Sequence, residues 1–322
     1  MKKKQNKFFI LDRTDELNLK SKLMNIVSFF LFVFYRIIYF FCRVEDHQKK
    51  YNVSICAIFK NEAVYLKEWL EYNHLIGVEH FYLYNNNSDD DYMKVLSPYI
   101  SEGLVTLVQW PKNQAQIEAY NHCITHFRDE SKWIGFIDID EFIVPIAQNS
   151  IYDILKPFDR KRGAIKFYWK MFGTSGKLKR DIKNLVTEDF TICWPKYYIV
   201  GKCFYNTNFK YNKDISRNRF LHHNFWIRYK GIDLPPVNIE GKVSYKEFDK
   251  ISINKHVAQI NHYFSKSFEE YQLKRSKGDV YFKINPHDKE YFYLHEYENT
   301  DIDFSIFKYM IKLKEKMEEA QY

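Results

Sequence analysis

Short apolar runs alternate with amphipathic segments along residues 51–138 of this 322-residue chain. The pattern predicts strands at 53–59, 80–84, 105–109 and 133–138, separated by helices at 62–76, 92–100 and 117–128. Parallel strands need such helical crossovers to bring the chain back to the same end of the sheet. The alternation therefore predicts an α/β fold, with right-handed βαβ units around a mostly parallel, Rossmann-like central sheet flanked by helices.

The first predicted helix carries Leu66, Trp69 and Leu70 on one face, which is expected to pack on the sheet. Glu68 and Glu71 fall on the opposite face and are expected to point into solvent. The segment 305–321 repeats apolar residues at a spacing of four, three and four, and this pattern predicts an amphipathic helix packed on the core. Its apolar residues are Ile306, Met310, Leu313 and Met317.

The composition is that of a folded, densely packed protein. Aromatic residues make up 19% of the chain, and there are only 10 Gly and 8 Pro, which excludes a disordered or collagen-like chain. The five cysteines are widely spaced and include no CxxC pair, so neither a zinc knuckle nor a disulfide framework is indicated. The net charge of +8 suits phosphate-bearing ligands or an anionic membrane, but the basic residues are dispersed and match no nucleic-acid-binding motif.

Residues 1–50 are predicted to be a basic tail followed by a membrane-associating helix. The stretch from Met24 to Cys42 is almost entirely apolar and as a helix would reach about 28 Å, near the thickness of a bilayer core. Arg36 lies inside it, and a charge there disfavours a span, so an interfacial helix competes with a single-pass type II anchor. The short connection to the first strand favours attachment at the cytoplasmic face of the membrane.

Asp138, Asp140 and Glu141 directly follow the last strand of the predicted parallel set. Ligands of open parallel sheets bind at the carboxyl ends of the strands, and carboxylate oxygens suit Mg²⁺ or Mn²⁺. Asp138 and Asp140 are two residues apart, so extended backbone points both to the same side, where a cation could bridge a diphosphate. We therefore favour a metal site over an exposed acidic turn, with Glu141 as either a third ligand or a packing partner.

Polar residues also follow the first two predicted strands. Lys60, Asn61 and Glu62 end the first strand, and the segment 84–91 (YNNNSDDD) ends the second. These side chains can hydrogen-bond a base or ribose, although a plain polar turn explains the second segment equally well. The segment 173–177 (GTSGK) lacks both ends of a P-loop, and His122 and His126 lack the glutamate of a zinc protease helix.

Six segments in a fixed order carry a resemblance to a known family. They read KNEAVYLKEWLEYNHLIGVEHFYLYNNNSDD, QIEAYNHC, SKWIGFIDIDEFIVP, WKMFGTSGK, VTEDF and INHYFSKSFEE. With them the chain closely resembles glycosyltransferase family 92 and related family 2-like bacterial enzymes, which have a GT-A fold and a DxD motif. The resemblance spans roughly residues 52–278, and a catalytic domain at 51–280 with a C-terminal extension at 281–322 is expected.

The resemblance implies roles for particular residues. Asp138 and Asp140 would hold Mn²⁺ or Mg²⁺ on the diphosphate of a nucleotide-sugar, with a UDP-sugar favoured, and His222 and His262 would complete the metal shell. The chain has Asn85 where the family pattern tends to have Asp. The nucleoside would contact residues at the ends of the first two strands, namely Lys60, Asn61, Glu62, Asn87 and Asp90.

The implied reaction is metal-assisted displacement at the anomeric carbon, with inversion and one catalytic base. Glu188 in VTEDF is the candidate base, with Asp189 behind it, and Trp169 and Phe172 are candidates for an apolar wall beside the acceptor. The resemblance also implies a bacterial setting, at the cytoplasmic face of the inner membrane, with a glycan or glycolipid of lipopolysaccharide, capsule or another surface polymer as the acceptor. A metal-dependent phosphotransferase or phosphohydrolase, and a catalytically inactive membrane-associated glycan-binding protein, are the alternatives.

Overall fold

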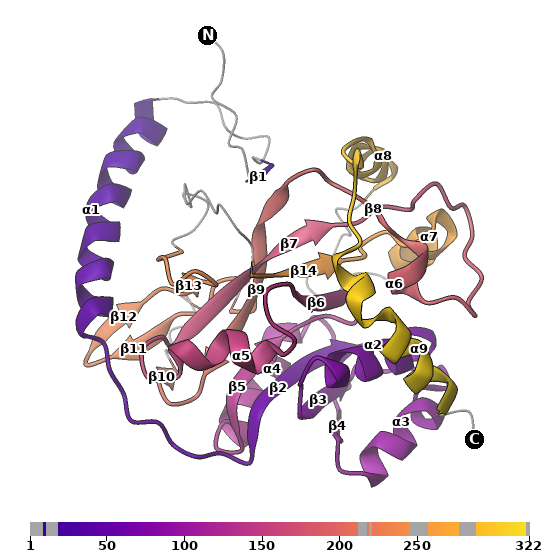
Figure 1. Cartoon of the computed structure of the whole chain (residues 1–322), viewed down its shortest axis with the longest axis horizontal. Helices are drawn as coiled ribbons and strands as arrows, with labels where there is room; N and C mark the ends of the chain where they lie inside the picture. The colour runs from indigo at the N-terminus through magenta and orange to yellow at the C-terminus, as the bar shows by residue number, and fades with distance from the viewer. Residues whose placement is uncertain are drawn as a thin grey trace.

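A ten-stranded sheet forms the centre of the protein (Figure 1). The computed structural model describes residues 9–10, 19–211, 218, 221–244, 257–276 and 288–319. The main path of the sheet has the order β4-β3-β2-β5-β9-β7-β14-β6, while β1 pairs with β9 and β13 pairs with β7. The strands of this path are β2 (Tyr51–Phe59), β3 (His80–Asn85), β4 (Val105–Gln109), β5 (Ser131–Phe136), β6 (Glu141–Pro145), β7 (Ala164–Met171), β9 (Tyr197–Asn206) and β14 (Ala258–His262).

The N-terminal half of the sheet is parallel, as the alternation of apolar and amphipathic segments predicts. Strands β2, β3, β4 and β5 run in the same direction. They are connected by α2 (Ala63–Leu75), α3 (Tyr92–Ser101) and α4 (Gln116–Phe127). The predicted strands and helices of this half are confirmed, with small differences at their ends.

The first strand of this half, β2, lies between β3 and β5. The chain moves outward from β2 to β3 and β4, and then returns to the other side of β2 to form β5. Right-handed crossovers in opposite directions place helices on opposite faces of a sheet, so α4 covers the face opposite to α2 and α3. The order of the strands therefore reverses at the carboxyl ends of β2 and β5, and such a reversal point is where ligands bind in open α/β sheets.

The second half of the sheet is mixed, and its order could not be read from the sequence. Strand β9 runs antiparallel to both β5 and β7, whereas β14 runs parallel to β7 and antiparallel to β6. The last of these pairings places His262 opposite Glu141. A residue from the far end of the chain therefore lies beside the acidic segment that follows β5.

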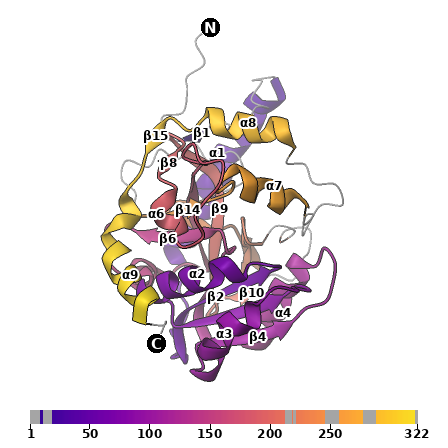
Figure 2. The same ribbon diagram turned by 90° about the vertical axis from the view of Figure 1, so that its right-hand side faces the viewer.

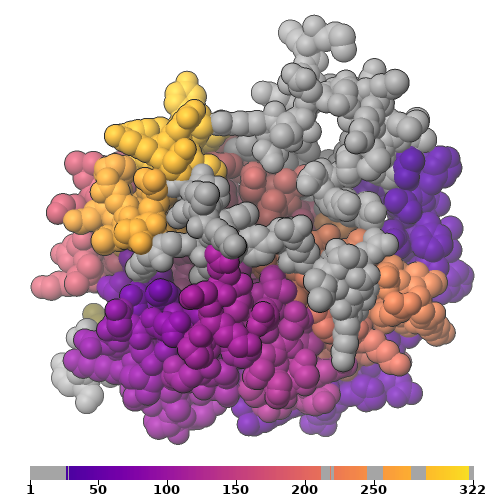
Figure 3. All heavy atoms as spheres, turned by 180° about the vertical axis from the view of Figure 1, so that it is seen from behind, coloured from indigo at the N-terminus to yellow at the C-terminus, as the bar shows by residue number. Residues whose placement is uncertain are grey.

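The remaining elements surround the sheet. In Figure 2, α9 lies beside α2, and Figures 1 and 3 show α7 and α8 at the edge of the molecule opposite to α1. The helices are α1 (Leu19–Phe41), α5 (Ile151–Leu155), η1 (Lys156–Phe158), α6 (Val186–Asp189), α7 (Phe268–Ser276), α8 (Lys289–Tyr297), η3 (Ser305–Tyr309) and α9 (Met310–Glu319). The short strands are β1 (Phe9–Ile10), β8 (Ile192–Cys193), β10 (Lys210–Tyr211), β11 (Ile227–Tyr229), β12 (Ile232–Leu234), β13 (Val237–Asn238) and β15 (Asp301–Ile302).

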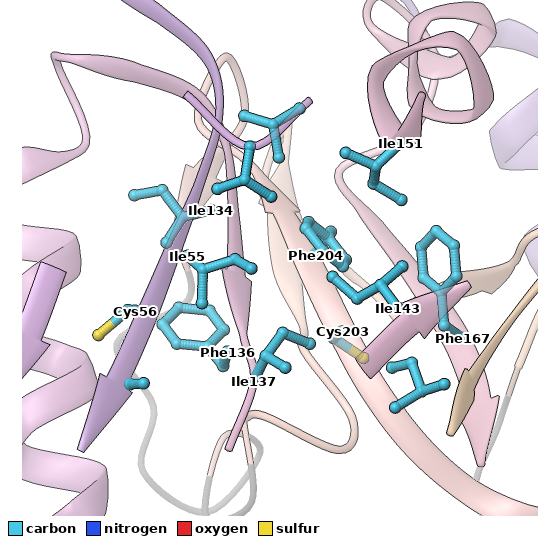
Figure 4. Close-up of a cluster of buried hydrophobic side chains, with 14 of the residues drawn as sticks. Ile55, Cys56, Ile134, Phe136, Ile137, Ile143, Ile151, Phe167, Cys203 and Phe204 are labelled. Atoms are coloured by element: carbon cyan, nitrogen blue, oxygen red, sulfur yellow. The ribbon is translucent and has the colours of Figure 1, made fainter. Parts of the chain in front are cut away.

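One continuous core lies between the sheet and its helices (Figure 4). It joins Ile55 of β2 and Ile134 of β5 to Phe167 of β7 and Phe204 of β9. These strands are covered on both faces, which explains why the sequence shows continuous apolar runs instead of strict alternation. The C-terminal helix also contributes, as its spacing predicts: Leu313 is 1% exposed.

The prediction that Glu68 faces solvent is wrong. Its side chain is 4% exposed, and its carboxylate accepts hydrogen bonds from Val186 N at 2.8 Å and Thr187 N at 2.9 Å. Thr187 Oγ1 donates a third bond at 2.8 Å. Helical periodicity identifies the face that packs on the sheet, but it does not show that a distant segment, here α6, covers another face of the same helix.

Helix α1 packs one face against the domain. The ring centroids of Tyr35 and Trp226 are 6.2 Å apart, and Tyr39 is 2% exposed with the guanidinium of Arg162 over its ring. The opposite face of α1 exposes apolar side chains, among them Phe40 at 72%. Within the described part of the chain, no helix has both the length and the apolar character that a membrane span requires.

Candidate active site

The acidic segment after β5 forms a tight turn that leads into β6. Strand β5 ends at Phe136, so Asp138 and Asp140 lie in the turn and not on the extended strand that the sequence predicts. The indole Nε1 of Trp69 donates to the carbonyl of Asp138 at 3.1 Å and to that of Glu141 at 2.9 Å. Glu141 in turn accepts a bond from the backbone N of Asp138 at 2.9 Å. The backbone of the turn is therefore fixed by buried contacts from α2 and β6.

The two aspartates of this turn have different partners. Asp138 accepts a bond from Lys202 Nζ at 2.6 Å, from Tyr120 OH at 3.1 Å and from Gln116 Nε2 at 3.3 Å. Gln116 and Tyr120 lie on α4, and Lys202 lies on β9. Asp140 instead faces β14 and α7. The two carboxylates therefore point to different partners. The prediction that an extended backbone directs both to the same side is wrong.

Lys202 compensates two carboxylates at once. Its side chain is 0% exposed, and its Nζ lies 2.6 Å from Asp138 Oδ2 and 3.5 Å from Glu141 Oε2. Burial lowers the pKa of Lys202, but the two carboxylates more than offset this and raise it above its ordinary value. Burial raises the pKa of Glu141 well above its ordinary value, since Lys202 offsets burial only in part. Of the two roles expected for Glu141, the contacts are those of a packing partner.

Asp140 lies between a lysine and a histidine. Its Oδ2 is 2.5 Å from Lys274 Nζ and 3.7 Å from His262 Nε2, and its side chain is 10% exposed. Burial alone raises the pKa of Asp140, but Lys274 and His262 together hold it well below its ordinary value. Its carbonyl accepts a bond from Tyr263 N at 2.9 Å, which ties the end of β14 to the turn. Asp140 is therefore an ionised carboxylate held against β14.

The two histidines implied by the family resemblance are separated. His262 lies beside Asp140, whereas His222 packs its ring 5.6 Å from that of Tyr120 and 3.9 Å from that of His223. Burial lowers the pKa of both His222 and His262, so both rings are neutral near pH 7. In each ring Nδ1 is buried and has no hydrogen-bond partner among the described residues.

A divalent cation has two protein ligands available here. Across the ranges that the structure describes, no three His, Cys, Asp or Glu side chains are gathered as a complete metal site. Asp140 and His262 nevertheless offer a carboxylate and a neutral imidazole on the same side of the turn. Mg²⁺ commonly takes only one or two protein ligands when substrate phosphates and water supply the rest. The residues therefore fit a cation that binds together with a diphosphate.

The loops after β2 and β3 are bonded to each other. Asn61 N donates to Ser88 Oγ at 2.9 Å, and Asn61 Oδ1 accepts from Asp89 N at 2.9 Å. Asp90 accepts a bond from Ala63 N at 2.8 Å and so caps α2, while Glu62 makes no capping bond. Asn61 and Asp90 thus support the loop, with Lys60 partly exposed at the end of β2 and Asn87 exposed after β3.

The contacts of Asn85 explain why this chain has Asn where the family pattern tends to have Asp. Asn85 is 4% exposed, and its amide nitrogen donates to Gln109 Oε1 at 2.7 Å while its oxygen accepts from Ser88 N at 3.0 Å. An aspartate could accept the bond from Ser88 but could not donate the one to Gln109. Asn85 therefore belongs to the framework under the loop.

The acids of α6 have lysine partners on other segments. Glu188 pairs with Lys314 of α9 at 2.6 Å, and the two side chains are 40% and 42% exposed. Asp189 pairs with Lys177 at 2.7 Å, is 6% exposed, and keeps a buried Oδ2 with no partner among the described residues. Neither acid is therefore among the residues that contact Asp138 or Asp140 in the described part of the chain.

Of the two aromatic residues proposed for an acceptor wall, only one has a suitable position. Phe172 is 0% exposed and packs its ring against Tyr263, so it belongs to the core. Trp169 is half-buried, and its ring centroid lies 4.6 Å from that of His262. Trp169 therefore offers a partly exposed apolar surface next to His262.

Sequence analysis missed Lys202 and Lys274, the two lysines that neutralise the turn. Lys202 lies in the irregular half of the sequence, where no motif marks it. Gln116 and Tyr120 carried a signal, because they belong to the segment QIEAYNHC, but their hydrogen bonds to Asp138 depend on how α4 packs.

The family model and the most similar sequence relatives point to the same protein family. Residues 49–289 match the sequence model of glycosyltransferase family 92. A family 92 protein of Oryza sativa subsp. japonica is 34% identical over 143 residues, which cover 44% of this chain and 24% of that protein. The beta-1,4-galactosyltransferase galt-1 of Caenorhabditis elegans is 30% identical over 169 residues, which cover 45% of this chain and 38% of that protein. The chain thus spans well under half the length of these relatives.

Among solved structures, one match is the crystal structure of GalNAc-T7 with UDP, GalNAc and Mn²⁺. The two chains are 11% identical with a TM-score of 0.37, over 83% of this chain and 57% of that one.

We expect Lys202→Met to destabilise the protein by about 3 kcal/mol, because it leaves buried carboxylates without their cation. Urea unfolding of the full chain measures this free energy. Lys112→Met is the matched control, since Lys112 and Glu118 form an exposed pair at 3.1 Å and its loss should change stability by about 0.5 kcal/mol or less. Equal stability of Lys202→Met and wild type would contradict the compensating role of Lys202.

Proposed function

Because the chain belongs to glycosyltransferase family 92, we propose that it transfers a sugar from a nucleotide-diphosphate donor to a glycan or glycolipid acceptor. The observation that carries the proposal is the Asp140 and His262 pair at the carboxyl end of the parallel strands, beside the reversal point of the sheet. A UDP-sugar is the proposed donor. UDP-galactose is the first to test, because the similar Caenorhabditis elegans protein is named as a galactosyltransferase.

Asp140 and His262 are the residues that would hold Mn²⁺ or Mg²⁺. The bound cation would supply positive charge to the leaving diphosphate. Lys202 has a different task, since it neutralises Asp138 and Glu141 and so keeps the turn in place while Asp140 faces the donor. Trp169, next to His262, offers an indole face on which an acceptor sugar can pack.

We assign the catalytic base of an inverting reaction to Asp189, ahead of Glu188. A base needs a carboxylate oxygen free to accept the proton of the acceptor hydroxyl. Asp189 keeps one buried oxygen without a partner among the described residues, while its other oxygen accepts a bond from Lys177 Nζ at 2.7 Å. Glu188 is an exposed carboxylate already paired with Lys314. Glu68 holds the start of α6 and thereby fixes the position of Asp189.

We also propose that α1 lies along an anionic membrane surface at the cytoplasmic face. Its inner face is fixed to the domain through Tyr35 and Tyr39, so a membrane on its outer face would set the orientation of the catalytic domain. Arg36 and Arg43 are exposed beside this face and suit lipid phosphates. The exposed apolar side chains of α1 are Val27, Phe29, Phe30, Val33, Phe34, Ile37, Phe40 and Phe41, at 42–72%. A single-pass anchor is the alternative.

Nucleotide binding to the full chain tests the donor site. We expect Mn²⁺ with UDP to raise the melting temperature, because ligand at one hundred times its Kd stabilises the folded state by about 2.7 kcal/mol. Asp140→Asn should lose the shift, and Glu118→Gln, an exposed change, should keep it. A metal-dependent rise in melting temperature with GDP or CMP instead of UDP would identify another donor class. Absence of any metal-dependent shift with a folded protein would refute the donor site, and hydrolysis of the sugar nucleotide to a nucleoside monophosphate and a sugar 1-phosphate would favour the phosphohydrolase alternative.

Sugar-transfer kinetics test the assignment of the base. Asp189→Asn should lower kcat by a factor of about 100 to 10,000, the usual contribution of general base catalysis, with nucleotide affinity retained. Glu188→Gln is the neighbouring control and should keep kcat within about threefold of wild type. The reverse order of the two effects would move the base to Glu188.

Vesicle co-sedimentation of the full chain tests the membrane proposal. Burying two phenylalanine rings contributes about 3 kcal/mol or more, so Phe40→Ser with Phe41→Ser should weaken binding to phosphatidylserine-containing vesicles by about 100-fold. Leu178→Ser, which changes an exposed residue outside α1, is the control. Equal binding of both variants would contradict the proposal. Protein that resists extraction by alkaline carbonate would favour the single-pass anchor.

A further inference from the structure

The loop between β14 and α7 carries a buried lysine beside the candidate site. Lys266 is 6% exposed and lies in the segment between the end of β14 at His262 and the start of α7 at Phe268. The loop is held at both ends: Tyr263 N donates to the Asp140 carbonyl at 2.9 Å, and Phe268 N donates to the Lys177 carbonyl at 3.1 Å. Lys266 is therefore in a fixed position and not on a free surface loop.

Lys266 is not ion-paired with a carboxylate of the described residues. Buried lysines are normally paired, yet within the described ranges no Asp or Glu oxygen lies within 4.0 Å of its Nζ. Its Nζ instead lies 4.2 Å from the centroid of the Tyr65 ring. That ring is held in place because Tyr65 OH donates to Glu270 at 2.8 Å. The ammonium group is thus positioned by an aromatic face, which leaves its hydrogen-bond donors available to a ligand.

The protein retains Lys266 at a cost in stability. Its φ is +50°, a left-handed conformation that is unfavourable for any residue with a Cβ, and burial lowers its pKa. Both effects oppose a lysine at this position. Strained residues of this kind cluster at ligand-binding sites, where the strained side chain serves the ligand.

A second lysine of the same segment completes a positively charged cluster. Lys274 of α7 binds Asp140 at 2.5 Å, but its side chain is still 41% exposed. Burial lowers the pKa of Lys266, and the charges of Glu62, which follows β2, and of Asp140 offset this only in part. For Lys274, Asp140 and Glu62 outweigh burial and raise the pKa. The cluster therefore joins the end of β2 to the Asp140 and His262 pair.

We propose that Lys266 and Lys274 bind the diphosphate of the nucleotide donor, an inference that rests on the proposed function. Lys266 is the fixed contact, because no carboxylate of the described residues lies within 4.0 Å of its Nζ to compete with the phosphates. Lys274 is shared: it neutralises Asp140 in the ligand-free protein, and a cation on Asp140 would compete with it and release it toward the phosphates. Lysine binds phosphate as a point charge, which suits a ligand with two adjacent phosphates.

Calorimetric titration of the full chain with UDP, uridine and inorganic pyrophosphate tests Lys266. Lys266→Met should lower the affinity for UDP and pyrophosphate at least tenfold and leave uridine binding unchanged. The ligand-free variant should melt at the same temperature as wild type or higher, and Lys266→Gly higher still, because it also relieves the positive φ. Lys112→Met, an exposed change, is the control for net charge.

The outcomes separate this inference from the proposed function. UDP affinity within twofold of wild type in Lys266→Met, or a lower melting temperature with equal loss of UDP and uridine, would overturn the role of Lys266. Wild-type binding of pyrophosphate but of no nucleotide, lost in Lys266→Met, would support the diphosphate site and refute the nucleotide donor. Wild-type binding of neither would overturn both.

Lys274 has its own test, which does not depend on activity. Lys274→Met should raise the affinity for Mn²⁺ measured without nucleotide, because the cation no longer competes with the ammonium group for Asp140. The same variant should bind UDP more weakly in the presence of Mn²⁺. Unchanged or weaker Mn²⁺ binding would show that Lys274 does not compete with the metal ion for Asp140.

Discussion

Three carboxylates within four residues impose the main constraint on this structure. Asp138, Asp140 and Glu141 lie where β5 passes into β6, under helices that keep water away from Glu141 and Asp140. Uncompensated burial of even one such charge is strongly unfavourable. The chain meets the constraint with cations from elements distant in sequence, Lys202 from β9 and Lys274 from α7. The mixed half of the sheet can therefore be understood as the scaffold that delivers these cations.

The two aspartates of the DxD-like segment, Asp138 and Asp140, have different partners and different roles. Asp138 is bonded to a buried lysine and to two residues of α4, so it belongs to the framework. Asp140 is paired with His262 and with the partly exposed Lys274, so in the proposed site a metal ion would take the place of the Lys274 ammonium group. A carboxylate with an exchangeable partner suits a site that must bind and release a charged ligand in each cycle.

Helix α2 connects the two acidic regions of the protein through neighbouring residues. Trp69 holds the backbone of the turn that contains Asp138, and Glu68 caps α6, which carries Asp189. Adjacent helical residues point about 100° apart, so one turn of α2 reaches both segments. The relative position of the donor site and the proposed base therefore depends on the packing of a single helix.

The sequence by itself determined the parallel half of the fold, the family, and the placement of Asp138 and Asp140 at the end of β5. These features depend on local periodicity and on motifs of a few residues, which neighbouring positions in the chain record. Only the tertiary structure decided that His262 lies beside Asp140 while His222 does not, that Lys202 and Lys274 neutralise the turn, and that Glu68 is buried. Each of these depends on strand pairing or helix packing between segments more than 60 residues apart, and long-range pairing leaves no periodic signal in either segment.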